Sequence, residues 1–282
     1  MNIFYLVTII LFVAGQNIVQ KPYSVKTKGQ GAYLFGLMTA FASMLFFVFS
    51  SKNMQWDIRI IPYSLLFATV YATSTIATFV AIASGAMSLT SLITSYSLMI
   101  PTVYGLIFLH ESISIGFVCG IVLLMISLFL INQKTGSVKI SLKWVISVTI
   151  AFVAGGLCSV FQNLQQVTFN GAYKNEFMIV ALLFVSIVFF IMVLVKEKNG
   201  LISYVKTGWY MGLFCGIMNG IVNLFVMILS ARMSVSIMFP LISAGGIIVT
   251  YIFSRFVFKE RLTNRQFAGF ILGIISVVLL NL

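Results

Sequence analysis

The chain is a series of apolar runs, each about as long as a membrane-spanning helix, separated by short polar breaks. A hydrocarbon core about 30 Å thick needs about 20 apolar residues per helix. Because backbone groups in lipid must be satisfied within the segment, and no period-2 alternation is present, these runs predict helices. Ten runs lie at about 2–20, 31–50, 59–83, 86–109, 113–132, 143–168, 175–195, 207–230, 233–257 and 264–281.

Composition agrees with a lipid environment. Of the 282 residues, 61% are hydrophobic and only 8% are charged, far from the balance of a soluble domain. The polar breaks are too short to hold a soluble domain. The sequence therefore predicts an all-α, multi-pass integral membrane protein in contact with the lipid bilayer.

An internal repeat divides the chain into two halves. Four residues recur at a separation of 149 positions: Glu111, Gly120, Ser127 and Asn132 are matched by Glu260, Gly269, Ser276 and Asn281. Two further echoes occur in the same order: Gln16-Asn17 with Gln162-Asn163, and Met87-Ser88 with Met233-Ser234. Membrane transporters are commonly built from such repeats.

The number of spans determines how the two halves should be related. Ten spans give five per half, and a half with five crossings ends on the opposite side of the membrane, so its copy must start upside down. We expect two inverted five-helix repeats, residues 1–132 and 143–282, joined by a connecting loop at 133–142.

The breaks before the fifth and tenth spans carry a family resemblance. Glu111 precedes a Gly-rich fifth span, and Lys259-Glu260-Arg261-Leu262 precedes the tenth. With the ten-span layout, the whole chain resembles the drug/metabolite transporter (DMT) superfamily, in particular its EamA-like members. The resemblance implies a secondary carrier with alternating access and a cavity formed mainly by the third, fourth, eighth and ninth spans.

Polar side chains recur on single faces of those spans. Thr94, Ser97 and Tyr104 are spaced by three and seven residues in the fourth span, which places them on one helical face. Such a stripe predicts a wet cavity; alternatively, each hydroxyl bonds a carbonyl of its own helix. The candidate substrate-binding residues are Tyr71, Ser74, Thr78, Thr94, Ser97, Tyr104, Asn163, Gln166, Asn219, Asn223, Ser243 and Tyr251.

Amide side chains are concentrated in the first and sixth spans. An unpaired amide in hydrocarbon costs several kcal/mol, so these side chains must find partners. Two interpretations are open: pairing between helices, or direct binding of substrate by Asn163 and Gln166. The amides concerned are Gln16, Asn17, Gln162, Asn163, Gln165 and Gln166.

Acidic residues lie outside the spans. All five fall in or beside breaks, so no mid-membrane carboxylate marks a site for a coupling ion. Small multidrug exporters of the same superfamily use a first-span glutamate for proton exchange, whereas this chain has Gln16. Glu111 and Glu260 are expected near the N-termini of the helices that follow them, where the helix dipole favours a carboxylate.

Glycines and basic residues carry structural information. Gly212, Gly216 and Gly220 recur every four residues, which predicts a close approach of two membrane helices. The Lys and Arg residues divide 13 to 4 between alternate breaks, which places both termini outside the cell, whereas many relatives have cytoplasmic termini. The net charge of +12 follows from this bias and indicates no nucleic-acid partner.

No catalytic or metal-binding motif is present, so we expect no enzyme activity and no cofactor or metal. The expected function is secondary transport of a small polar or amphiphilic metabolite, an amino acid or a nucleoside-like solute, across the cell membrane by a monomer or homodimer. One alternative is export of drugs, organic cations or quaternary ammonium compounds, held by tyrosine rings through cation–π contacts. Others are a lipid flippase or scramblase and a non-transporting scaffold.

Overall fold

Helices form the described part of the chain. The computed structural model describes residues 2–28, 30–51, 53–84, 90, 93–94, 96–111, 114–132, 141–258 and 263–279, and all regular elements among them are helices. The α-helices are α1 (Asn2–Lys26), α2 (Ala32–Ser50), α3 (Ile60–Ser84), α5 (Met99–Phe108), α6 (Ile115–Asn132), α7 (Leu142–Thr168), α8 (Lys174–Lys196), α9 (Leu201–Ser230), α10 (Val235–Phe258) and α11 (Asn264–Leu279). Short 3-10 helices, η1 (Tyr96–Leu98) and η2 (Lys198–Gly200), precede α5 and α9.

The predicted spans and the observed helices correspond in order. Within the described residues, six helical segments are long and apolar enough to cross a membrane, and four shorter apolar helices accompany them. Two boundaries differ from expectation: α1 continues beyond the first apolar run to Lys26, and α9 starts at Leu201 rather than near 207. In both places polar residues extend the helix because tertiary contacts hold it.

Two compact units divide the chain. Unit 1 comprises Met1–Ala72 and Phe161–Ala231, and unit 2 comprises Thr73–Val160 and Arg232–Leu282. The boundaries at Ala72 and Val160 fall inside α3 and α7, so each of these helices contributes to both units. The units therefore do not coincide with the sequence halves 1–132 and 143–282, whose inverted relationship stays a prediction.

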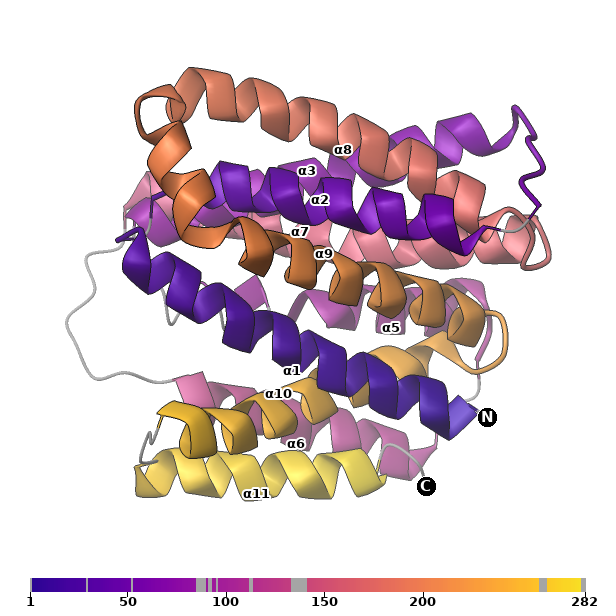
Figure 1. The fold of residues 1–282 in the computed structure, drawn as a ribbon. Coiled ribbons are helices and arrows are strands. Elements are labelled where there is room, and N and C mark those ends of the chain that lie inside the picture. Colours follow the sequence, from indigo (N-terminus) through magenta and orange to yellow (C-terminus); the bar gives the residue numbers. More distant parts are fainter. Residues whose placement is uncertain are drawn as a thin grey trace. The chain divides into compact units, whose positions relative to one another are not determined.

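In unit 1, α2 lies between α8 and α9, and α1 lies along α9 (Figure 1). The glycines of α9 make the α2 contact possible. A Cβ at Gly212 would meet Met38, one at Gly216 would lie 2.4 Å from the Ala42 Cβ, and one at Gly220 would meet Phe46. The four-residue glycine spacing thus faces a matching four-residue spacing on α2. The predicted close helix approach is confirmed.

Contacts at the C-terminal end of α1 explain why this helix continues beyond the predicted apolar run. The Tyr23 ring packs on Phe35, with ring centroids 4.7 Å apart, and its hydroxyl donates to the Gly31 carbonyl at 2.9 Å. Gly31 has φ of 73°, which glycine adopts without steric cost. α9 is kinked at Gly208, where a Cβ would lie 2.1 Å from the Tyr23 ring. These contacts stabilise the last turn of α1 past its apolar run.

In unit 2, α6 packs along α11, and α10 contacts both α5 and α11 (Figure 1). The recurring serine and glycine of the fifth and tenth spans meet here. The Ser127 hydroxyl donates to the Gly269 carbonyl at 2.6 Å, and Ser127 is 1% exposed. These two residues of the repeat therefore contribute to helix packing.

The glycine contacts predict a difference in stability. Gly216→Ala should destabilise the protein by about 1–3 kcal/mol, because the new methyl group meets the Thr39 carbonyl and the Ala42 Cβ. Gly15→Ala is the matched control, since its methyl group would meet only the flexible end of Met218. Thermal unfolding of the detergent-purified variants measures both. Equal melting temperatures for the two variants would contradict the packing role.

Candidate functional site

A hydrogen-bond network of amides joins four helices of unit 1. Asn219 of α9 is its centre: its Nδ2 donates to Gln16 Oε1 of α1 at 3.3 Å, and its Oδ1 accepts from Ser43 of α2 at 3.4 Å. Asn223 Nδ2 donates to Asn219 Oδ1 at 2.9 Å, and Gln162 Nε2 of α7 donates to Asn223 Oδ1 at 2.7 Å. Four members of the network are amide side chains, and they come from three different helices, α1, α7 and α9. Interhelical pairing is thus the role that the structure gives to Gln16 and Gln162.

A second group of amides lies at the C-terminal end of α7 and is more deeply buried. Asn163 and Gln166 are 1% and 2% exposed. Asn163 Nδ2 donates to the Ser230 carbonyl at 3.3 Å, and Gln166 Nε2 donates to Gln165 Oε1. Asn163 Oδ1 and Gln166 Oε1 are both buried without a hydrogen-bond partner. Residues three apart share a helical face, so one side of α7 carries two unused acceptors in the interior of unit 1.

Unit 2 holds most of the predicted hydroxyl stripe. Thr78 and Thr94 donate to the carbonyls four residues earlier, at 2.8 and 2.9 Å, as expected for hydroxyls that bond their own helix. Ser74 instead crosses to α7 and donates to the Ala151 carbonyl at 3.1 Å. A Cβ at Gly155 would lie 3.1 Å from Ser74 Oγ and 3.3 Å from Ser97 Oγ. The two predicted serines therefore meet beside a glycine of α7.

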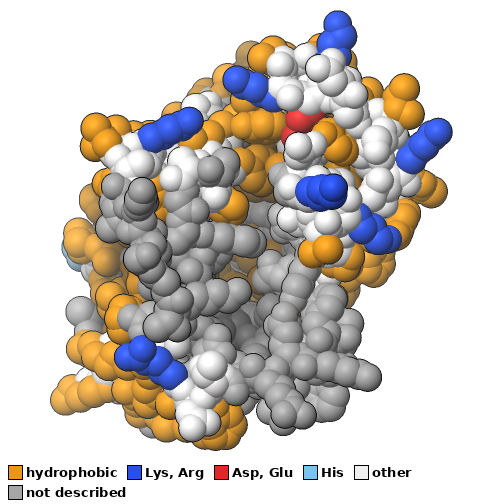
Figure 2. All heavy atoms as spheres, turned by 90° about the vertical axis from the view of Figure 1, so that its left-hand side faces the viewer, with side chains coloured by type: hydrophobic (Ala, Val, Ile, Leu, Met, Phe, Trp, Pro, Cys, Tyr) orange, Lys and Arg blue, Asp and Glu red, His pale blue; other side chains and the backbone are white. Residues whose placement is uncertain are grey.

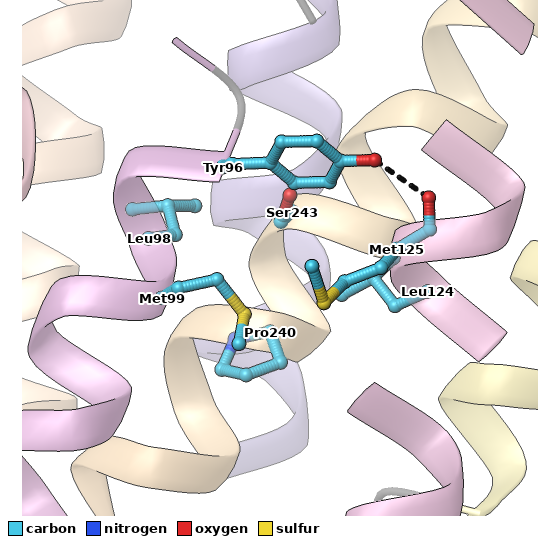
Figure 3. Close-up of a pocket in the computed structure, with 7 residues that line it drawn as sticks. All are labelled: Tyr96, Leu98, Met99, Leu124, Met125, Pro240 and Ser243. Atoms are coloured by element: carbon cyan, nitrogen blue, oxygen red, sulfur yellow. Dashed lines mark hydrogen bonds between the residues drawn. The ribbon is translucent and has the colours of Figure 1, made fainter. Parts of the chain in front are cut away.

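A small pocket in unit 2 includes one more predicted residue. Figure 3 shows Tyr96, Met99, Met125, Pro240 and Ser243 around it, with the Tyr96 hydroxyl donating to the Met125 carbonyl at 2.6 Å. The remaining lining residues are Leu98 and Leu124. Its volume of about 10 Å³ is that of one water molecule. The pocket as it stands cannot hold a metabolite.

The other predicted residues are dispersed. Tyr104 of unit 2 stacks on Phe108, with centroids 5.5 Å apart. Tyr71 of unit 1 packs on Phe67 at 5.7 Å. The side chain of Tyr251, like all of Glu260, lies outside the described residues. The predicted site residues thus fall into local groups within each unit.

Two glutamates accept hydrogen bonds from helix N-termini far away in sequence. Glu111 Oε1 and Oε2 accept from the backbone amides of Val235 and Ser236, both at 2.8 Å, at the start of α10. Glu197 likewise accepts from Tyr33 at 3.0 Å and Leu34 at 2.8 Å, at the start of α2. Glu111 lies just before α6, as expected, and its two carboxylate oxygens bind the start of a different helix, α10. A carboxylate satisfies two otherwise unpaired amides wherever the fold brings them.

The two remaining described acids also have local partners. Asp57 forms an ion pair with Arg59 at 2.6 Å in the loop before α3, and the hydrogen bonds from the guanidinium lower the pKa of Asp57. Glu176 of α8 accepts from the backbone amide of Gln55 at 3.0 Å. All four described acids therefore contribute to local structure at helix ends or in loops.

Comparison with known proteins decides the family. Residues 140–282 match the model of the EamA-like transporter family. The chain belongs to that family. This family match is consistent with the drug/metabolite transporter superfamily. It points to a non-enzymatic membrane transporter with several membrane-spanning helices. No curated protein shows significant similarity to the chain.

The fold of this EamA-like transporter also occurs in a solved structure, described only as a crystal structure of a protein. The two chains superpose with a TM-score of 0.80 at 11% sequence identity, over 98% of this chain and 94% of the other. At this identity the likeness establishes the fold alone.

Sequence reasoning missed several residues of these sites. Glu197 and Glu176 were assigned no structural partners. Glu176 in the first turn of α8 agrees with the helix dipole, whereas Glu197 at the C-terminal end of α8 gave no signal that it caps α2. Ser43 gave no signal, because a lone serine in an apolar helix is common. Its contact with Asn219 depends on the glycine-mediated approach of α9 to α2.

The amide network predicts a cost for removing its centre. Asn219→Ala should destabilise this EamA-like transporter by about 1–3 kcal/mol, because hydrogen-bonding groups of Gln16, Ser43 and Asn223 lose their partner. Asn199→Ala, on an exposed asparagine of η2, is the control. The measurement is thermal unfolding in detergent. If both variants melt alike, the network contributes nothing to stability.

Proposed function

We propose that this chain is a secondary transporter that moves a small polar or amphiphilic metabolite, an amino acid or nucleoside-like solute, across the cell membrane by alternating access. Family membership and the apolar helices support membrane transport. The observation that carries the substrate class is the pair of buried acceptors, Asn163 Oδ1 and Gln166 Oε1. An uncharged acceptor pair suits a solute with N–H or O–H donors.

A bound solute would compensate the energetic cost of these two buried acceptors. A buried polar atom without a partner costs about 1–3 kcal/mol, and proteins retain few of them. A solute that donates hydrogen bonds to both oxygens removes this cost only while it is bound. The two atoms therefore favour a bound state with a polar ligand over an empty one.

Alternating access belongs to this proposal through the family membership of the chain. The inverted relationship of the two sequence halves belongs to the same proposal, since inverted repeats commonly supply the two alternating states.

The basic residues of unit 1 support one membrane orientation as part of this proposal. In unit 1, exposed lysines surround the end of the unit at which α1 and α8 end, and Figure 2 shows several Lys and Arg side chains with a single small spot of acidic atoms on the face in view. These lysines are Lys26, Lys28, Lys196, Lys198 and Lys206. The positive-inside rule assigns this end to the cytoplasm.

Binding experiments test the acceptor pair. A thermal-shift screen of the purified protein against amino acids, nucleosides, sugars and quaternary ammonium compounds should give a hit, because a ligand of the folded state raises its stability. Asn163→Ala and Gln166→Ala should each make the binding free energy of that ligand less favourable by about 1–3 kcal/mol, which raises its Kd about five- to 150-fold.

Ile93→Ala is the control, since Ile93 packs against the buried cluster of Ala81, Trp144 and Val148 and should change only stability. A ligand that binds the Asn163 and Gln166 variants unchanged would place the substrate site elsewhere.

Proton independence is the second expectation. Because Glu111 is engaged by two backbone amides, transport in liposomes should proceed down a substrate gradient or by exchange, without a pH gradient. Glu111→Gln should lower thermal stability by about 0.5–2 kcal/mol, because an amide side chain has one oxygen where the carboxylate has two. Proton-driven uphill accumulation that Glu111→Gln abolishes would show instead that Glu111 is the coupling site.

A further inference from the structure

A polar pocket of about 300 Å³ opens at one end of unit 1, and none of the buried amides Asn163, Gln165 and Gln166 is among its lining residues. Asn53 and Gln55 of the loop between α2 and α3 form one side, and residues 171–176, at the start of α8, form the other. Ligand sites in proteins begin at about this volume. Both segments are polar breaks between apolar runs, so the pocket lies at the aqueous end of the unit.

The turn that forms one wall is firmly held. Asn170, Gly171 and Tyr173 all have left-handed backbone conformations, with φ of 51°, 77° and 57°. Glycine adopts this region freely, whereas a tyrosine there is uncommon. Gln165 Nε2 donates to the Ala172 carbonyl at 2.9 Å, and the Tyr173 ring packs on Phe169 at 5.7 Å. The wall is therefore a fixed shape.

Glu176 differs from the other two described glutamates. Glu111 and Glu197 each use both oxygens on backbone amides, whereas Glu176 uses Oε1 on Gln55 and its Oε2 has no hydrogen-bond partner among the described residues. Glu176 is only 6% exposed and lines the pocket. A carboxylate oxygen that lines an open pocket can accept a hydrogen bond from a donor of a ligand. The remaining oxygen therefore offers the pocket an acceptor for an ammonium group.

The same wall supplies a positive charge. Lys174 lines the pocket two residues before Glu176, and its ammonium donates to the Gly171 carbonyl. Asn175 between them has a buried Oδ1 without a hydrogen-bond partner. Opposite charges on one small wall favour a ligand that carries both charges close together over a simple amine or a simple carboxylate.

We propose that this pocket binds a zwitterionic solute with the chemistry of a free α-amino acid, its ammonium at Glu176 and its carboxylate toward Lys174. The inference concerns binding at the aqueous end of unit 1. It holds whether or not the buried acceptors of Asn163 and Gln166 form a transport site.

The test measures binding to the detergent-purified full chain. The twenty standard amino acids are screened by thermal shift, and the one with the largest shift is titrated calorimetrically beside its desamino and decarboxy analogues. We expect saturable binding of the amino acid and at least tenfold weaker binding of both analogues. The proposal would be overturned if none of the twenty amino acids binds, or if either analogue binds as tightly as the amino acid.

Three variants locate the site. Glu176→Gln keeps an acceptor for the Gln55 backbone amide but removes the charge. It should lower the affinity for the amino acid at least tenfold. Lys174→Met should weaken the amino acid while leaving the decarboxy analogue unchanged, which keeps the test informative if the Glu176 variant misfolds. Glu197→Gln is the matched control in the same unit and should leave binding unchanged.

Asn163→Ala separates this proposal from the transport site. Amino-acid binding that persists in Asn163→Ala and is lost in Glu176→Gln supports the pocket. Binding that is lost in Asn163→Ala and kept in Glu176→Gln would reject the pocket while supporting the buried amides as the substrate site.

Discussion

Unpaired backbone amides at helix N-termini are the constraint on which much of this structure depends. The first amides of a helix lack partners within the helix and need acceptors from outside it. Glu111 supplies two acceptors to α10, and Glu197 supplies two to α2. Each carboxylate joins a break in one sequence half to a helix start in the other. Glu111 and Glu197 thus stabilise the packing within their own units.

The carboxylates lie at helix ends, and the polar side chains in the interior of unit 1 include several neutral amides. The network centred on Asn219 satisfies its members by pairing between helices, whereas Asn163 and Gln166 keep one acceptor each without a partner. The paired network contributes to fixing the positions of α1, α2, α7 and α9. Amide side chains therefore differ in role within unit 1. Those around Asn219 pair between helices, and those of Asn163 and Gln166 are the proposed ligand acceptors.

Much of the fold was predictable because its signals are local. Apolar runs gave the helices in the correct order, and the glycine spacing of α9 gave a face that does pack closely on α2. Helix ends were less predictable: α1 runs on to Lys26 because Tyr23 fits against Gly208 and Phe35, residues that are distant in sequence. Among the candidate site residues, Ser74 and Ser97 lie beside the same glycine of α7, while Thr78 and Thr94 bond their own helices.

Sequence alone determined the solvent, the helical class, the family resemblance and the placement of acids in the breaks, because hydrophobicity and residue spacing act over one helix at a time. Tertiary structure decided which helix start each carboxylate serves and which amides remain unpaired. Backbone amides are chemically the same in every helix, so nothing in the residues near Glu111 points to Val235, 124 positions away. That choice follows from packing, where the approach of α2 to α9 and of α6 to α11 depends on small residues meeting across long separations.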